Sequence, residues 1–399
     1  MSSEIKAILA EKMSDSRGNP TLRVEVETAD GKFSAGVPSG ASTGEGEAVA
    51  LNADKAVENV NKIIAPELKG NDVADQEGLD RLMIEMDGTK DKSKLGANAI
   101  LGVSLAAARA GAAGLNVPLW RYISSISGQK PFLSVPTFNI INGGAHAKNN
   151  LSLQEFMAVI EGGSPEKNLE SGSAVYRELE KLIEEEYGRE ALVLGDEGGF
   201  APPLSGAEEA IELILKAARK AGCEKITKIA VDAAASQFYK NGKYQVGFDF
   251  LDRGELLRYY MELADKYPIV SLEDPFQEED WQGFIDIQKE IGDKVIIVGD
   301  DLLVSNSERI KEAEEKKACN GLILKVNQVG TLSEGIEAGK LAKSFGWKVI
   351  VSHRSGETED DFIADLAVGL GANYLKSGAP ATEFRMAKYK RLLKITEEM

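Results

Sequence analysis

The segments IVSLEDP (269–275), VIIVGDD (295–301) and GLILKVN (321–327) follow one another in the second half of the chain, and each is a short apolar run that ends in charged residues. Three further runs extend the pattern, namely IAVDAA (229–234), KVIVSHRS (348–355) and NYLKSG (373–378). Helix-like segments lie between most of them, such as Gly254 to Lys266, Ser307 to Lys317 and Ser333 to Phe345. This alternation is typical of a parallel sheet whose strands are joined by helices.

Two more apolar runs, VPTFNII (135–141) and LQEFMAV (153–159), come before these six. Only the Gly-rich stretch INGGAHAKNN separates them, which is too short for a helical crossover, so we expect the two strands to be antiparallel. With them the count reaches eight strands, which is enough to close a barrel. A ninth short run, Leu192 to Leu194, is predicted to belong to a loop.

The first third of the chain has a different pattern. From Ile5 to about Val37, short β-prone runs alternate with turn-rich pieces, which predicts a small meander. Helical spacing of apolar residues follows, in the segments Ala53 to Ile64, Glu77 to Met86 and Asn98 to Ala113. The Ser- and Gly-rich stretch Ser124 to Pro131 is the best boundary, so we expect an α+β domain over residues 1–128 and a barrel over residues 129–399.

Charge and cysteine content exclude several classes of protein. The chain has 47 Lys and Arg against 64 Asp and Glu, a net charge of −17, which repels nucleic acids and anionic membranes. We therefore expect neither as a partner. The two cysteines, Cys223 and Cys319, lie far apart and suggest neither a disulfide framework nor a zinc cluster. The N-terminal segment lacks the apolar run of a signal peptide, and the sequence predicts a cytoplasmic protein.

Polar residues stand at the predicted strand ends. In a (β/α)₈ barrel the carboxyl ends of the strands open onto the active site, so side chains that are remote in sequence converge there. Three carboxylates facing one mouth repel each other unless a cation holds them, and ligation by oxygen alone suits Mg²⁺. An Asp after a strand is often only a helix N-cap, but three acids in register with two lysines favour a site. The residues at these positions are Asp232, Glu273, Asp300, Lys325, His353 and Lys376.

Lys325 interrupts an apolar strand run, where an ammonium group is costly to bury without a partner. Near Mg²⁺, burial and like charge lower the pKa of such a lysine, which makes it a candidate general base. The alternative is a salt bridge to a core carboxylate, and both interpretations can hold together.

The only two histidines, His146 and His353, fall in the loop motifs NGGAHAKN and SHRSGE. A lone His is often structural, but Arg354 and Ser355 beside His353 offer the donors that a phosphate binds. Two more loops are rich in glycine. GDEGGF (195–200) is either a tight turn or a loop that closes on a substrate, and PSGASTGEGE (38–47), which is no P-loop, is either a surface turn or a mobile lid whose Ser42 or Thr43 reaches a metal.

Taken together, these residues resemble the enolase family, and the resemblance runs in order along nearly the whole chain. The segment SHRSGETED alone is highly specific. The other matching segments are DSRGNP, LGANAILGVS, NGGAHAKNNLSLQEF, GDEGGF, VDAAAS, LEDP, VGDDL, LKVNQVGT and LKSGAP. The resemblance implies the Mg²⁺-dependent, reversible dehydration of 2-phosphoglycerate to phosphoenolpyruvate, and a TIM-like barrel of β₂α₂(βα)₆ order capped by the N-terminal α+β domain. Sites of this superfamily use a Lys or His base together with Mg²⁺.

The resemblance also implies a role for each matching residue. Lys325 should remove the proton from C2, and Glu197 should protonate the departing C3 hydroxyl. Ser42 should reach a second Mg²⁺ that arrives with the substrate. The first Mg²⁺ should be held by Asp232, Glu273 and Asp300. The hydroxyl end of the substrate should be supported by His146, Gln154 and Glu155, the phosphate should be gripped by Arg354 and Ser355, and the rest of the substrate should be lined by Ser352, His353 and Lys376.

Three positions depart from the family pattern. Glu11 stands where the family usually has Arg, and Thr382 and Phe384 replace Arg and Glu of the motif near the end. In the family those Arg and Glu residues form salt bridges across a dimer, so the departures put the usual dimer contact in doubt but not the chemistry. Two rival hypotheses stay open: a related lyase that acts on an unphosphorylated acid, and a catalytically silent scaffold.

Overall fold

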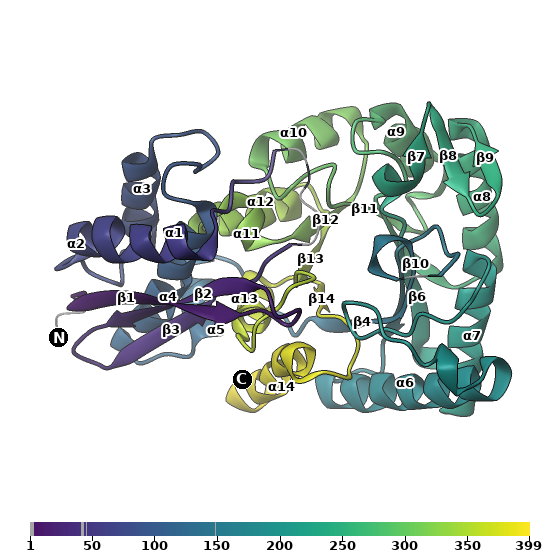
Figure 1. Cartoon of the computed structure of the whole chain (residues 1–399), viewed down its shortest axis with the longest axis horizontal. Helices are drawn as coiled ribbons and strands as arrows, with labels where there is room; N and C mark the ends of the chain where they lie inside the picture. The colour runs from purple at the N-terminus through teal and green to yellow at the C-terminus, as the bar shows by residue number, and fades with distance from the viewer. Residues whose placement is uncertain (1–3, 41–43, 45, 148) are drawn as a thin grey trace.

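The computed structural model describes residues 4–40, 44, 46–147 and 149–399. Its N-terminal part is an antiparallel three-stranded sheet in the order β1-β2-β3, as the meander pattern predicts. Helices cover one face of the sheet (Figure 1). The strands are β1 (Ala7–Ser14), β2 (Pro20–Glu27) and β3 (Lys32–Gly36), and the helices are α1 (Ala53–Asn59), α2 (Ala65–Leu68), α3 (Gln76–Asp87), α4 (Ala97–Gly114) and α5 (Leu119–Ser127).

Helix α4 packs closely against the sheet because its sequence, ANAILGVSLAAARAGAAG, consists mostly of small residues. A Cβ atom at Gly102 would lie 2.5 Å from a methyl group of Val24 on β2, so only glycine allows this approach. Val24 alternates along its strand with outward-facing polar residues and is wholly buried, which is the period-two pattern of a half-buried strand.

Two details of this domain differ from the sequence expectations. The predicted helix from Ala53 to Ile64 is α1 followed by a π-helical turn over Val60–Ile64, and α2 continues it. The boundary stretch is only partly a loop, because α5 runs to Ser127 and ends at Gly128, which adopts a left-handed conformation (φ 66°). The serines of α5 made this stretch look like a loop in the sequence, although the helix buries an apolar face.

The second part is a closed barrel in which eight strands follow the order β10-β11-β12-β13-β14-β4-β5-β6. Strands β4 and β5 are antiparallel, and β5 is also antiparallel to β6, whereas the remaining pairs are parallel. This confirms the predicted strand count and the antiparallel pair. The barrel strands are β4 (Val135–Asn142), β5 (Glu155–Ile160), β6 (Thr227–Asp232), β10 (Ile269–Glu273), β11 (Ile296–Gly299), β12 (Gly321–Leu324), β13 (Lys348–Ser352) and β14 (Tyr374–Lys376).

Two helices follow β5 and a helix follows each later strand, which is the β₂α₂(βα)₆ order. They form a layer around the barrel, and the N-terminal domain lies at one side of it (Figure 1). The helices are α6 (Pro165–Tyr187), α7 (Ala207–Lys220), α8 (Arg253–Lys266), α9 (Trp281–Ile291), α10 (Ser307–Lys316), α11 (Val326–Val329), α12 (Leu332–Ser344), α13 (Phe362–Leu370) and α14 (Glu383–Glu398).

One element was not expected from the sequence. A small antiparallel sheet, β7 (Tyr239–Lys240), β8 (Lys243–Val246) and β9 (Asp249–Leu251), lies between β6 and α8. Its first turn is the dipeptide Asn241–Gly242, in which both residues have positive φ (52° and 81°). Asn-Gly between two short β-prone runs is a strong hairpin signal, and it could have revealed this sheet.

Polar contacts bind the N-terminal domain to the barrel. Arg109 of α4 pairs with Asp360 and Asp361, and Lys92 lies 2.8 Å from Glu334 of α12. Such contacts join the domain to the barrel. Within the described residues no single helix is long and apolar enough to cross a membrane, and the one pair that passes that test together, α4 with α5, is bent by 101°.

Candidate active site

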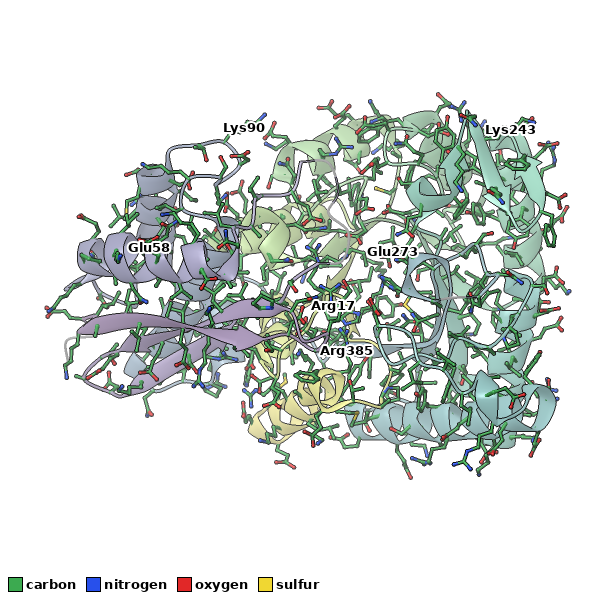
Figure 2. All side chains as sticks on the ribbon, in the orientation of Figure 1. Arg17, Glu58, Lys90, Lys243, Glu273 and Arg385 are labelled. Carbon is green, nitrogen blue, oxygen red and sulfur yellow. The ribbon has the colours of Figure 1, made fainter. Side chains whose placement is uncertain are left out.

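One polar cavity opens at the mouth of the barrel, and it is lined by twelve of the fourteen site residues that the sequence predicted. Of the other two, Glu273 lies near the middle of the molecule (Figure 2) and contacts Lys376 of the cavity lining, and Ser42 lies outside the described residues. The twelve are His146, Gln154, Glu155, Glu197, Asp232, Asp300, Lys325, Ser352, His353, Arg354, Ser355 and Lys376.

The strand register explains why these residues meet. Asp232 ends β6 and pairs directly with Glu273 at the end of β10, while Ser352 of β13 pairs with Lys376 of β14. Glu155 instead begins β5, but because β5 is antiparallel its first residue lies at the same mouth, opposite Asp232. Parallel strands alone would have placed Glu155 at the far end of the barrel.

Lys376 stands at the centre of an acidic cluster. Its Nζ lies 2.9 Å from Glu273 Oε2, 3.0 Å from Glu155 Oε2 and 3.6 Å from Asp232 Oδ2. Burial lowers the pKa of Lys376, but the carboxylates around it, Glu155 first and then Glu273, Asp232 and Glu197, together hold that pKa above its usual value. Burial, reinforced by neighbouring carboxylates, raises the pKa of both Glu273 and Glu155. The single positive charge of Lys376 therefore does not neutralise the carboxylates of Glu155, Asp232 and Glu273 around it.

Lys325 follows β12 directly and contacts the carboxylate of Asp300. The expected lowering of its pKa is not found in this structure: burial is the largest single cause and lowers the pKa, but the carboxylates around the lysine, Asp300 first and then Glu273, leave that pKa raised. The salt bridge that the sequence argument kept as an alternative is thus present. Gln328 donates to the other oxygen of Asp300, over 3.0 Å, so the carboxylate is held from two sides.

The residues present fit a divalent cation of the oxygen-binding kind. Three carboxylates from adjacent strands, those of Asp232, Glu273 and Asp300, reach one region in which the lysines leave negative charge uncompensated, and Mg²⁺ prefers such ligands. Two groups of side chains also have ligand atoms that all lie within 4.8 Å of one another. These groups are His146 with Glu155 and Glu197, and Asp274 with Asp300 and Asp301. The predicted trio is not one of them; in this structure its carboxylates contact lysines instead, Asp300 with Lys325, and Asp232 and Glu273 with Lys376.

Glu197 lies on the other side of the cavity in the GDEGGF loop and is buried. Its Oε2 accepts a hydrogen bond from Asn139 Nδ2 at 2.9 Å and lies 3.1 Å from His353 Nε2. His146 Nδ1 is 3.9 Å from Glu197 Oε1. Burial alone would raise the pKa of Glu197, but His353 and His146, whose ring nitrogens face it, hold that pKa below its usual value. Glu197 is therefore a carboxylate at neutral pH in this structure.

The SHRSGE loop follows β13 and supplies cationic and polar groups. Arg354 lies 3.0 Å from both Glu47 Oε2 and Asn327 Oδ1. Ser355 lies beside it in the cavity lining. The hydroxyl of Ser352 donates to the carbonyl oxygen of His353 at 3.2 Å, which ties the end of the strand to the loop.

Comparison with known proteins identifies the architecture. The protein-family model "Enolase, N-terminal domain" matches residues 5–123, and the family model "Enolase, C-terminal TIM barrel domain" matches residues 130–399. The enolase of Thermococcus gammatolerans is 53% identical over 411 residues, which cover 99% of this chain and 95% of that relative. Enolase B of Dictyostelium discoideum and the enolase of Methanocaldococcus jannaschii are each 52% identical, over 99% of this chain. The chain belongs to the enolase family.

Membership confirms the resemblance and the fold predicted from the sequence. Enolases are phosphopyruvate hydratases, Mg²⁺-dependent carbon–oxygen lyases that reversibly dehydrate 2-phospho-D-glycerate to phosphoenolpyruvate in glycolysis and gluconeogenesis, and this is the activity of the chain.

Several residues of this enolase site were not singled out from the sequence. Glu47 was quoted within PSGASTGEGE but given no role, although it pairs with Arg354. Gln237 donates to Gln154 Oε1 at 2.6 Å, and Gln154 donates in turn to Asp232. Asp274 accepts from the backbone N–H groups of Asp300 and Asp301 and so fixes the loop after β11. The motifs LEDP and VGDDL contain these acids, but nothing in either motif separates a ligand from a supporting residue.

Proposed function

We propose that Lys325 and Glu197 carry the two proton transfers of the enolase reaction. The observation behind this proposal is that both side chains line one cavity with different partners: Lys325 is paired with Asp300, and Glu197 with Asn139 and His353. Dehydration needs a base for the proton at C2 and an acid for the leaving hydroxyl at C3, and the two groups must differ in chemistry and position.

The ionised state of Glu197 suits the hydration direction, in which it accepts a proton from water. In the dehydration direction Glu197 must carry a proton. A bound phosphate beside His353 and Arg354 adds negative charge near Glu197, and like charge raises the pKa of a carboxyl group. The substrate itself thus favours the protonated acid that its own dehydration requires.

Arg354 and Ser355 are proposed to hold the phosphate, with Ser352, His353 and Lys376 along the substrate. In this structure Arg354 pairs with Glu47. A phosphate forms stronger charge-assisted hydrogen bonds to a guanidinium than a single carboxylate contact does, so we infer that the substrate takes the place of Glu47 on Arg354. His146, Gln154 and Glu155 support the hydroxyl end.

Asp232, Glu273 and Asp300 would hold Mg²⁺, and Ser42 a second ion that arrives with the substrate. Removing the C2 proton turns the substrate carboxylate into a dianion, and a cation placed there when bound supplies the positive charge that stabilises it. Among the residues of this chain, Lys376 already presents a fixed positive charge within the same acidic cluster.

The activity is tested by adding 2-phosphoglycerate with and without Mg²⁺ and following the ultraviolet absorbance of the enol phosphate double bond. A metal-dependent rise that EDTA abolishes is expected. Turnover of an unphosphorylated hydroxy acid with none of 2-phosphoglycerate would favour the related lyase, and no turnover of either by folded protein with bound metal would favour the silent scaffold.

The residue roles are tested by exchange of the C2 proton with solvent deuterium. Lys325→Ala should lose both dehydration and exchange, whereas Glu197→Gln should stop dehydration and still permit slow exchange. Lys317→Ala is the matched control, because the Lys317 side chain is 72% exposed and outside the cavity lining. Loss of exchange in Glu197→Gln as well would show that the base and acid are wrongly assigned.

We also propose a cytoplasmic location and an assembly that differs from the usual enolase dimer. Both cysteines are free and buried, which suits a reducing compartment.

The proposed difference in assembly rests on the three positions that depart from the family pattern. Glu11 lies opposite Arg23 in the β1–β2 pair, and Thr382 and Phe384 stand at the start of α14. Sedimentation of the purified protein tests the assembly, and a dimer that salt does not weaken would argue for contacts other than ion pairs.

A further inference from the structure

The last helix, α14, has a row of polar side chains on the face that is buried in the protein. Arg385, Lys388 and Tyr389 are spaced by three and four residues, so they lie on one face of the helix, and each is about 1% exposed. All three contact the loops at the barrel mouth. In Figure 2, Arg385 lies between α14 and Arg17, at the centre of the molecule, and both arginines line the same surface pocket.

Arg385 contacts backbone carbonyl groups and an imidazole. Its guanidinium donates to the carbonyl oxygens of Arg354 at 2.6 Å, Ser355 at 2.7 Å and Asp196 at 3.1 Å, and its NH1 also contacts His353 Nδ1. Among the ion pairs of the described residues none involves Arg385. The contacts join the loop that carries His353 to the loop that carries Glu197.

The contact with His353 determines which ring nitrogen carries the proton. A guanidinium has donors only and stays protonated in proteins, so His353 Nδ1 must accept the bond. The proton of the neutral ring is then on Nε2, which lies 3.1 Å from Glu197 Oε2. We propose that Arg385 is a positioning residue that holds His353 as the neutral Nε2–H tautomer, with the proton on the ring nitrogen that lies beside Glu197.

The surroundings of His353 agree with this assignment. The charged groups that act on the ring are Glu197, Arg385 and Glu357. Burial and the charge of Arg385 lower the pKa of His353 to about 4, although Glu197 acts in the opposite direction. The ring is therefore neutral at physiological pH, and only its tautomer needs to be fixed.

The functional consequence rests on the proposed role of Glu197. A polar Nε2–H group 3.1 Å from Glu197 Oε2 stabilises the carboxylate form of Glu197 by its dipole, although the two groups are not aligned as a hydrogen bond in this structure. The other tautomer would turn a bare lone pair toward Glu197 Oε2, and a proton on Glu197 would then be needed for that contact. Through one ring, Arg385 would thus set the resting protonation of a group that it does not touch.

The tautomer can be measured directly because the chain has only two histidines. The Mg²⁺-loaded enzyme, with ¹⁵N-labelled imidazole rings, should give two ring systems in two-bond ¹H–¹⁵N spectra, which a His146→Asn variant assigns. We expect His353 to show the Nε2–H pattern throughout pH 5.5 to 8.5. An Nδ1–H pattern, or an imidazolium at pH 7, in the unmodified enzyme would overturn the proposal without any variant.

Two variants of Arg385 and one control extend the test. Arg385→Met should give mixed tautomers and raise the pKa of His353 by about one unit, since a neighbouring positive charge is lost, and Arg385→Lys should restore the Nε2–H pattern. Lys388→Met is the matched control: it removes a buried cation from the same face of α14, where Lys388 lies 2.7 Å from Glu357 and does not contact His353. It should lower stability and leave the tautomer unchanged.

A purely structural role would lower stability in Arg385→Met as well but leave the His353 spectrum as in the unmodified enzyme, which would overturn the proposal. The spectrum does not depend on turnover. The predicted tautomer together with full dehydration by Glu197→Gln would therefore refute the proposed role of Glu197 and leave the assignment of Arg385 intact.

Discussion

The ion pair between Arg109 and Asp360 joins the N-terminal domain to the barrel, and its removal has a calculable effect. Arg109 NH1 lies 2.5 Å from Asp360 Oδ2, and NH2 lies 3.0 Å from Oδ1, which is a two-bond contact. Removing one partner of a buried pair costs about 3–5 kcal/mol because the other charge is left uncompensated. Asp360 would keep the N–H groups of Gly36 and Phe362, each at 2.9 Å. We therefore expect Arg109→Met to lower the free energy of unfolding by about 3 kcal/mol, at the low end of that range.

The pH dependence of this loss has a definite sign. Burial is the largest single cause and raises the pKa of Asp360, but the charge and hydrogen bonds of Arg109, together with the backbone N–H groups of Gly36 and Phe362, hold that pKa below its usual value. A carboxyl group with a lowered folded-state pKa contributes stability that is present above its unfolded pKa, about 3.9, and is lost as the pH falls through the folded value. The difference between the unmodified protein and Arg109→Met should be complete at pH 7 and should shrink as the pH falls below about 4.

Urea unfolding followed by circular dichroism, at pH 7 and in steps down to pH 3, measures both effects. The control is Lys32→Met, which removes a pair with Glu25 at 2.8 Å whose lysine side chain is 61% exposed, and which should change stability far less. Asp360→Asn in the Arg109→Met background should recover part of the loss. The reasoning fails if Arg109→Met behaves like Lys32→Met at pH 7, or if its loss is the same at pH 3.

Three further outcomes are expected. Lys376→Met should destabilise the metal-free enzyme by about 3–5 kcal/mol, because Glu155 and Glu273 lose their shared cation, and Mg²⁺ should restore part of its melting temperature; no restoration would argue against the metal fit. Asn139→Ala should lower kcat roughly 10- to 100-fold, the equivalent of about 1.5–3 kcal/mol for a charge-assisted hydrogen bond to Glu197, and an unchanged kcat would remove Asn139 from the site. EDTA should abolish turnover and lower the melting temperature, Mg²⁺ should reverse both, and turnover in EDTA would contradict the metal dependence.

The barrel could be predicted because its signal is local. A strand followed by a helix leaves apolar runs of fixed length, and the stretch INGGAHAKNN is too short to be anything but an antiparallel connection. The small sheet β7–β9 was missed because its strands have two to four residues, below the length at which period-two alternation can be recognised. The π-helical turn over Val60–Ile64 leaves no mark in the apolar spacing.

The site was predictable only where strand ends fix positions. Asp232 and Glu273 could be placed together because parallel strands end at one mouth, and their register bears this out. Which lysine contacts which acid depends on side-chain reach across the barrel, so the pairing of Lys325 with Asp300 could not be read from the motifs. Arg385 lies on a helix that follows the last strand, and nothing local indicates that its guanidinium reaches His353.

The two groups proposed for proton transfer have different kinds of partner. On one side, Lys325 is held by Asp300, and Lys376 is held by Glu155 and Glu273. On the other side, Glu197 is contacted by neutral donors, an amide and an imidazole, and the nearby cation, Arg385, reaches it only through His353. A lysine beside Glu197 would form a direct ion pair with it and hold it ionised throughout the reaction, whereas neutral donors allow its proton affinity to rise when an anionic phosphate arrives. This difference in partners is therefore what would allow one cavity to contain the proposed base, Lys325, and the proposed acid, Glu197, without their neutralising each other.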